Sequence, residues 1–158
     1  MKDISSDMLD RIDLKILRML QENGRFTNAE IAQQVNVSAA TCHRRTQRLF
    51  DEGYIKDVRA MVDPKRLGFG TLVIVGIVLD RSTPEAIAEF EHAVEGIEAI
   101  LDCDLVAGDF DYLLRIRVKD MEDYHHLLAK NLIALPGVRQ ARTFFVVREV
   151  KTNARLKI

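Results

Sequence analysis

Two carboxylates stand one residue apart in the segment Gly108–Tyr112, which reads GDFDY. Gly108 permits a backbone conformation, or a close approach, that other residues resist. A loop with exposed N–H groups and the side chains of Asp109 and Asp111 can hold a small zwitterion. The N–H groups would meet its carboxylate, and an Asp would meet its ammonium. An ordinary hairpin loop explains the same residues equally well, and the sequence favours neither interpretation.

Two further acids, Asp102 and Asp104, alternate with apolar residues and therefore share one face of an expected strand. Arg115 and Arg117 take the corresponding positions of the next expected strand. Opposite charges that face each other across neighbouring strands form ion pairs. We therefore predict cross-strand ion pairs here in preference to a metal site or a catalytic pair of carboxylates.

A second group suited to chemistry lies on a predicted helix that begins at Ser38 and ends at Gly53. From Ser38 to Leu49 the chain carries three Arg and no acid, although acids and bases number ten each over residues 1–63. Arg side chains bind guanine edges and phosphates in a bidentate manner. This placement favours a DNA-contacting face over the polar surface that any exposed helix carries.

The elements that position this face form a helix-turn-helix pattern. Thr27 and Glu30 make a capping box at the start of a short helix, and Asn36 suits the left-handed conformation that ends it. Ser38 is a good N-cap for the longer helix that follows. Such a pair places its second helix in the DNA major groove. An earlier helix with Asp10 as its N-cap completes a three-helix unit.

Residues 54–56 and 59–62 are expected to form the two strands of a wing. Asp63, Pro64 and two nearby glycines then break the pattern. We therefore predict a winged helix-turn-helix DNA-binding domain over residues 1–62, a linker over residues 63–70 and a second domain over residues 71–158.

The second domain alternates differently. Strands are expected at residues 71–79, 97–106, 112–118 and 138–150, with helices that open at Thr83 and Asp120. The order β-α-β-β-α-β predicts a ferredoxin-like domain, so the whole chain is of the α+β class.

The first strand of this domain is apolar on both faces. One face carries Leu72, Ile74 and Val78, and the other carries Val73, Val75, Ile77 and Leu79. Two helices cover only one face of such a sheet, and soluble monomers avoid a large exposed apolar patch. A second copy of the chain is the simplest cover, so we predict a homodimer that reads two DNA half-sites.

Composition limits the remaining possibilities. The formal net charge is −1, so DNA binding has to come from a local patch. An apolar run long enough for a membrane span and a signal peptide are both absent from the sequence. Two widely separated cysteines suggest a reducing, intracellular setting. The sequence also lacks a catalytic triad order, a metal-binding motif and a phosphate-binding glycine loop, so we predict no enzyme activity, metal or cofactor.

Five segments match, in order and spacing, the motifs of one family of bacterial and archaeal transcription factors. They are LDRIDLKIL at Leu9–Leu17, NGRFTNAEIA at Asn23–Ala32, RLFDEGYI at Arg48–Ile55, LVAGDFDYLLRIRVKDMEDY at Leu105–Tyr124 and LPGVRQARTFFVVREVK at Leu135–Lys151. On these motifs the chain resembles the Lrp/AsnC family over nearly its full length.

The resemblance implies a winged helix-turn-helix followed by a ligand-sensing ferredoxin-like domain of the RAM or ACT type. It also implies sheet-to-sheet dimers, often assembled into octamers, that bind an amino acid at subunit interfaces. The implied effector positions are Leu105, Gly108, Asp109, Asp111, Met121, Phe144, Phe145 and Val146. The implied DNA contacts are Ser38, Thr41, His43, Arg44, Arg45 and Arg48. Many members begin this helix with Ser-Pro-Thr-Pro, whereas this chain has Ser-Ala-Ala-Thr. The resemblance therefore does not imply which DNA operator sequence this chain recognises.

Together these observations predict a cytoplasmic, nucleoid-associated regulator that binds double-stranded promoter DNA. It would control genes of amino-acid metabolism or transport in response to an amino acid such as leucine. The alternative is an architectural DNA-binding protein without an effector, in which GDFDY is only a turn. A metabolic enzyme built on the second domain is disfavoured, because the sequence offers no nucleophile, base or cofactor motif.

Overall fold

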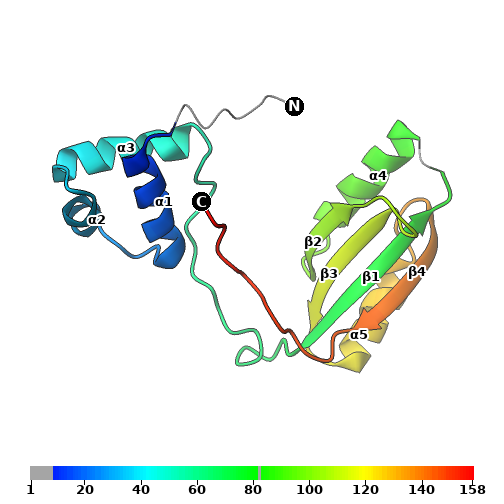
Figure 1. Cartoon of the computed structure of the whole chain (residues 1–158). Coiled ribbons are helices and arrows are strands. Elements are labelled where there is room, and N and C mark those ends of the chain that lie inside the picture. The colour runs from blue at the N-terminus through cyan, green and yellow to red at the C-terminus, as the bar shows by residue number, and fades with distance from the viewer. Residues whose placement is uncertain (1–8, 82) are drawn as a thin grey trace. The chain divides into compact units, whose positions relative to one another are not determined.

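The computed structural model describes residues 9–81 and 83–158, and the chain divides into two compact units (Figure 1). A helical unit contains residues 9–61 together with residues 151–158, and a sheet unit contains residues 62–150. The first eight residues of the predicted domain 1–62, on which the argument against a signal peptide depends, lie outside the described residues. Each helix of the described segments is too short or too polar to cross a membrane.

The helical unit consists of α1 (Arg11–Glu22), α2 (Asn28–Val35) and α3 (Ala39–Asp51). The side chains of Asp10, Thr27 and Ser38 cap the three helices in turn, as the sequence predicts. Asn36 ends α2 in the left-handed conformation, at φ 56° and ψ 50°, which produces the predicted tight turn before α3. The core between the helices is apolar and contains Ile16, Leu17, Ile31, Ala32, Val35, Cys42 and Leu49.

The cap of α1 makes the stability of this unit sensitive to acid. The backbone N–H of Asp13, and secondarily the guanidinium of Arg45, hold the pKa of Asp10 below its ordinary value of 3.8. A group with a depressed folded-state pKa contributes stability above its unfolded-state pKa, and this contribution disappears as the pH falls through the folded-state value. Asn is also a good N-cap, so Asp10→Asn removes the charge and keeps the cap.

We therefore expect Asp10→Asn to lower the free energy of unfolding near pH 7. The difference from the unsubstituted protein should shrink once the pH falls below about 4. Chemical denaturation followed by circular dichroism between pH 7 and pH 2.5 measures this difference. If the two proteins differ in the free energy of unfolding by the same amount from pH 7 to pH 2.5, the charge of Asp10 does not stabilise the folded unit.

The strands of the wing predicted at residues 54–56 and 59–62 do not form within the described chain, so this prediction was wrong. The N–H of Ile55 donates to the carbonyl of Leu49 at 3.0 Å, which folds the chain back onto α3. Val58 then lies so close to Gly24 that a Cβ at Gly24 would be 2.7 Å from its Cγ1. A two-residue hairpin turn needs positive φ values, and none occurs at residues 57–58 of this described segment.

The last eight residues belong to the helical unit, although the sequence grouped them with the second domain. The backbone N–H of Leu156 donates to Oε1 of Gln21 at 2.7 Å, and its carbonyl accepts from Nε2 of the same side chain at 3.3 Å. Arg18 Nε donates to the carbonyl of Ile158 at 2.6 Å. These bonds hold the C-terminal tail, residues 151–158, along α1.

The sheet unit has the strand order β2-β3-β1-β4, and all neighbouring strands are antiparallel. Its elements are β1 (Thr71–Leu79), α4 (Pro84–Glu95), β2 (Ile100–Leu105), β3 (Tyr112–Val118), α5 (Met121–Leu127), the wide turn η2 (Leu128–Leu132) and β4 (Val138–Phe145). Both helices lie on the same side of the sheet, behind it in Figure 1. This is the predicted ferredoxin-like arrangement.

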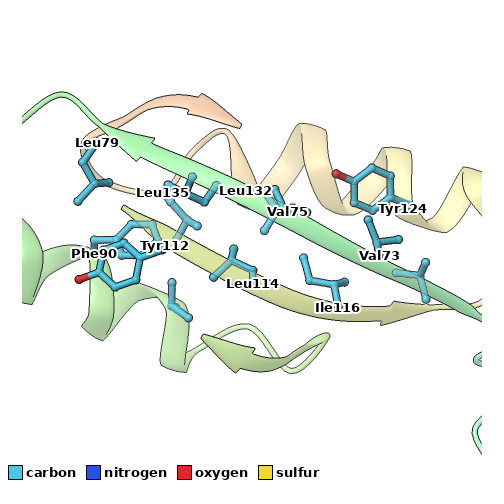
Figure 2. Close-up of a cluster of buried hydrophobic side chains, with 13 residues drawn as sticks. Val73, Val75, Leu79, Phe90, Tyr112, Leu114, Ile116, Tyr124, Leu132 and Leu135 are labelled. Atoms are coloured by element: carbon cyan, nitrogen blue, oxygen red, sulfur yellow. The ribbon is translucent and has the colours of Figure 1, made fainter. Parts of the chain in front are cut away.

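The core of this unit fills the space between the sheet and α4 and α5 (Figure 2). Alternate residues of β1 and β3 point into it, together with residues of both helices and of the segment after α5. The cluster contains Val73, Val75, Ile77, Leu79, Phe90, Val94, Tyr112, Leu114, Ile116, Val118, Tyr124, Leu132 and Leu135.

Two strands are shorter than predicted. β2 begins at Ile100 because the N–H of Ile97 closes the turn after α4 by donating to the carbonyl of Val94 at 3.0 Å. β4 ends at Phe145, and residues 146–150 leave the sheet after the N–H of Val146 has donated to the carbonyl of Leu72 at 3.0 Å.

Candidate functional site

The outer face of α3 is the exposed part of the helix-turn-helix. Cys42 and Leu49 are completely buried on the inner side of the helix. The opposite side presents His43, Arg44 and Gln47 to solvent. This is the polar face that the sequence predicts.

The predicted contacts at the start of α3 are ordered by local hydrogen bonds. The N–H of Thr41 donates to the Ser38 hydroxyl at 3.1 Å, and that hydroxyl also lies 2.9 Å from Oγ1 of Thr41. The Nδ1 atom of His43 is 3.1 Å from the side-chain amide of Asn28 on α2. Ser38, Thr41 and His43 therefore form a fixed polar edge beside Arg44.

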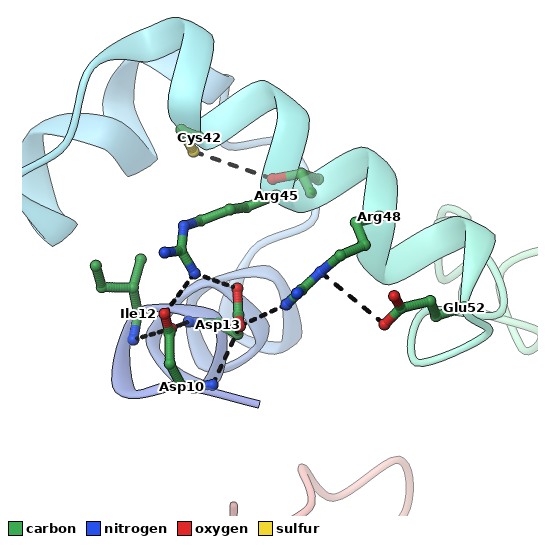
Figure 3. A network of polar contacts seen from close by, with 8 residues as sticks. Asp10, Ile12, Asp13, Cys42, Arg45, Arg48 and Glu52 are labelled. Atoms are coloured by element: carbon green, nitrogen blue, oxygen red, sulfur yellow. Dashed lines mark hydrogen bonds and ion pairs between the residues drawn. The ribbon is translucent and has the colours of Figure 1, made fainter. Parts of the chain in front are cut away.

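Arg45 and Arg48 behave differently, because both bind the same buried acid on α1 (Figure 3). Arg45 Nη1 donates to Oδ1 of Asp13 at 2.9 Å and to Oδ2 of Asp10 at 2.7 Å. Arg48 Nη2 donates to Oδ2 of Asp13 at 2.6 Å. The structure thus brings four of the six predicted DNA contacts to the outer edge of α3 and holds the other two against α1.

Sequence reasoning missed Asp13, although a signal was present. Asp13 lies three residues after Asp10, and its carboxylate accepts the Asp10 N–H at 3.1 Å to complete a capping box. It also shares a helix face with Ile16 and Leu17, which are buried. An acid at a core position needs a positive partner, and here two arginines supply it.

The Gly108–Asp111 loop connects β2 to β3 and is attached to the end of β1. The carboxylate of Asp111 accepts the N–H of Leu79 at 2.7 Å, and the Asp111 N–H donates to the carbonyl of Ile77 at 2.8 Å. Asp111 therefore has a structural role. Asp109 is exposed, and its carboxylate takes part in no hydrogen bond or ion pair with the described residues.

Phe110 is a further residue that sequence reasoning missed. Its ring lies against Gly76 in the middle of β1, where a Cβ would be 2.6 Å from the ring. The ring also meets Phe144 edge to face, with centroids 6.1 Å apart, and the guanidinium of Arg142 lies 5.9 Å from its centre. A glycine inside an apolar strand often marks such a close approach, and Gly76 was the available signal.

The remaining predicted effector positions divide into two groups within one chain. Leu105 ends β2 beside the loop, and Phe144 reaches the loop through Phe110. Phe145 instead pairs with Val73 near the start of β1 and contacts Tyr124 on α5. Met121 and Val146 lie at that same end, at the start of α5 and after β4.

The cross-strand ion pairs predicted between β2 and β3 are largely replaced by another partner. In the antiparallel register Asp102 lies opposite Arg115 and Asp104 opposite Leu113, which leaves Arg117 without an opposing acid on β2, so that pairing was wrong. Asp102 lies opposite Arg115, but its Oδ2 is 3.9 Å from Nε of Arg115, so this ion pair is long.

The carboxylate of Glu149 forms ion pairs with both arginines of β3. Arg115 Nη2 donates to its Oε1 at 2.8 Å, and Arg117 Nη2 donates to its Oε2 at 2.6 Å. The bond from Arg117 is the main cause that lowers the pKa of Glu149.

Among residues 9–81 and 83–158, no group of three or more His, Cys, Asp or Glu side chains is arranged to hold a metal ion.

Two family models match the chain. A winged helix-turn-helix DNA-binding model matches residues 9–56, and an Lrp/AsnC ligand-binding-domain model matches residues 72–156. The leucine-responsive regulatory proteins of Klebsiella pneumoniae and Escherichia coli are each 45% identical to the chain over 150 residues, which is 95% of this chain and 92% of theirs.

Solved structures agree with these matches. A transcriptional regulator of Neisseria meningitidis in complex with L-methionine has a TM-score of 0.88 and 33% identity, and the match covers 94% of this chain and 96% of that one. An AsnC-family regulator of Agrobacterium tumefaciens has a TM-score of 0.87 and 29% identity, with 94% and 97% covered. Regulators of this kind are not enzymes, which confirms the prediction that the chain has no enzyme activity. The chain belongs to the Lrp/AsnC family of transcriptional regulators.

Proposed function

We propose that this regulator binds promoter DNA as a homodimer and that an amino acid bound beside the Gly108–Asp111 loop changes this binding. Its targets would be genes of amino-acid metabolism or transport, on the nucleoid in the cytoplasm. The observation that carries the proposal is that the two acids of the loop, Asp109 and Asp111, have different surroundings. Asp111 fixes the loop to β1, while Asp109 of the same loop is exposed to solvent.

This arrangement suits a zwitterion. The Asp109 carboxylate can accept the ammonium group, and N–H groups of the loop can donate to the carboxylate. Phe110 follows Asp109 in the chain, and its ring and that of Phe144, whose centroids are 6.1 Å apart, can pack against an apolar side chain. Among the related regulators named above, two are called leucine-responsive regulatory proteins and one was solved with L-methionine, so leucine and methionine are the first candidates.

The open face of the sheet, opposite α4 and α5, supports the homodimer. Because Val73, Val75 and Ile77 point into the core, their neighbours Ile74 and Val78 point to the open face, where both stay partly exposed. Phe144 on β4 pairs with Ile74 and is 49% exposed. A second sheet packed on this face would bury these apolar side chains.

A site shared between chains would also explain the two groups of effector positions. Phe145 pairs with Val73, whereas the loop is bonded to Ile77 and Leu79. The two ends are about 13 Å apart along β1, at about 3.3 Å per residue. One small amino acid cannot touch both ends of one chain, but two ends from neighbouring chains can meet. We propose further assembly of the dimers to an octamer on the same grounds.

A screen of the twenty amino acids by thermal shift tests the proposal. A ligand that binds the native state raises its stability, by about 2.7 kcal/mol at one hundred times its Kd. We expect one or a few apolar amino acids to raise the melting temperature and to change the affinity for DNA. If none of the twenty does either, the effector proposal fails and an architectural DNA-binding role is favoured.

DNA recognition rests on the exposed Arg44. Arg44→Gln should weaken binding to a duplex selected from a random library by the unsubstituted protein, by about 10- to 100-fold if the side chain reads a base. If it touches phosphate, the slope of log K against log salt should fall by about one. The matched control is Arg81→Gln, the same charge change on an exposed residue of the sheet unit. Fluorescence anisotropy at several salt concentrations measures both quantities, and equal results for the two variants would refute the role of Arg44.

A further inference from the structure

The three arginines of α3 are not equivalent, because an acid on α1 occupies two of them. We propose that Asp13 is a positioning residue that determines DNA specificity. It holds Arg45 and Arg48 against α1, so that Arg44 is the arginine of α3 left to meet DNA. The inference rests on the proposed use of α3 to read DNA.

The geometry of the cluster is that of a fixed ion triad. Asp13 is 1% exposed, and each of its oxygens accepts from a different guanidinium, at 2.9 Å from Arg45 and at 2.6 Å from Arg48. Asp10 gives Arg45 a second partner at 2.7 Å, and these contacts raise the pKa of Arg45. The side chains of Arg45 and Arg48 are still 21% and 39% exposed, so a released guanidinium could reach solvent.

The carboxylate of Asp13 therefore has two effects on α3. It joins the middle and the end of α3 to the first turn of α1, which fixes the direction of the outer face. It also neutralises positive charge that would otherwise be available for phosphates. Charge of that kind supplies most of the sequence-independent affinity for DNA and none of the base recognition. An acid placed there lowers non-specific binding and leaves specific binding to the outer edge of α3.

The main test is Asp13→Asn, which keeps an acceptor oxygen and removes the charge. We expect affinity for a random duplex to rise and the slope of log K against log salt to steepen by about one, because Arg48 keeps only the long 3.9 Å contact with Glu52, whereas Arg45 keeps Asp10 at 2.7 Å. The ratio of specific to random affinity should fall at least tenfold. Asp57→Asn is the matched control, since Asp57 is an exposed acid of the helical unit that pairs with Arg59 and not with α3.

A purely structural role predicts a different result. If Asp13→Asn only loosened the helical unit, specific and random affinity would fall together, and this outcome would overturn the proposal. In the triple variant Asp13→Asn, Arg45→Gln, Arg48→Gln, the released charges are gone. We expect its random-duplex affinity and salt slope to return to the values of the unsubstituted protein, and a salt slope that stays steep would also overturn the proposal.

A second pair of variants keeps the test decisive if Asp13→Asn does not fold. Arg45→Gln and Arg48→Gln each leave Asp13 one partner. Neither should lower the salt slope, because neither guanidinium touches phosphate. A decrease of about one in either variant would mean that this arginine contacts DNA. If Arg44→Gln has no effect while these two do, the proposed reading face of α3 is itself wrong. If Arg44→Gln weakens binding and Asp13→Asn leaves the specificity ratio unchanged, only the role of Asp13 is wrong.

Discussion

Replacement of Ile74 by Asp is expected to give a monomer and to weaken binding to a selected two-half-site duplex by about 10²- to 10⁴-fold. Ile74 lies in the middle of β1 on the open face of the sheet, where the proposed partner chain packs. A charge at the centre of an apolar interface has to be desolvated without a partner, which opposes association. The two DNA-binding units then lose the link that makes the second binding event intramolecular.

The fold of the single chain should survive this substitution. Ile74 is outside the core cluster, and its neighbours Val73 and Val75 keep their places between the sheet and the helices. Circular dichroism should therefore be unchanged, while sedimentation velocity reports the loss of the dimer. Ile133→Asp introduces the same charge at a residue that is 61% exposed after η2, away from the open face. A dimeric Ile74→Asp protein with unchanged DNA affinity would show that the open face is not the interface.

Asp111→Ala and Asp109→Ala are expected to separate the structure of the effector loop from its chemistry. Asp111→Ala leaves the N–H of the buried Leu79 without its acceptor, which should lower the free energy of unfolding by about 1–3 kcal/mol. The melting temperature should then fall by at least about 2 °C. Asp109→Ala removes an exposed carboxylate without a bonded partner, so stability without effector should stay the same.

The two variants should also differ in their response to the amino acid found by the screen. Asp109→Ala should lose the thermal shift, because the ammonium group loses its counter-charge. Asp111→Asn keeps an oxygen that can accept from Leu79, and it should restore most of the stability lost in Asp111→Ala. Differential scanning fluorimetry with and without the amino acid measures all four proteins. An Asp109→Ala protein with a full thermal shift would remove Asp109 from the site.

Local chemistry made much of the helical unit predictable. Asp10, Thr27 and Ser38 cap their helices because short side-chain acceptors reach the free N–H groups of the first turn, a rule that depends on a few neighbouring residues. The contact between Asp13 and Arg48 spans 35 positions in the chain and depends on how α1 crosses α3. Such crossing geometry has no local signal, so the arginines looked like three equal candidates for DNA.

The sheet unit was predictable to a similar depth. Alternating apolar residues and the order of elements indicated the ferredoxin-like arrangement, because side chains of a strand point alternately to its two faces. The register between β2 and β3 was not predictable, and it sets Asp102 opposite Arg115 and Asp104 opposite Leu113. The role of Asp111 was also hidden, since a carboxylate that caps a strand end and one that binds an ammonium look alike in the sequence.

The C-terminal tail, residues 151–158, belongs to the helical unit and not to the sheet unit that precedes it in the chain. The chain leaves the helical unit at residue 62 and re-enters it at residue 151, so in terms of connectivity the sheet unit is an insertion within the helical unit. A purification tag or fluorescent protein fused after Ile158 would therefore be attached to the DNA-binding part, next to Arg18 and Gln21 of α1. A label intended to report on the sheet unit belongs on an exposed residue within residues 62–150, such as Glu89 on α4.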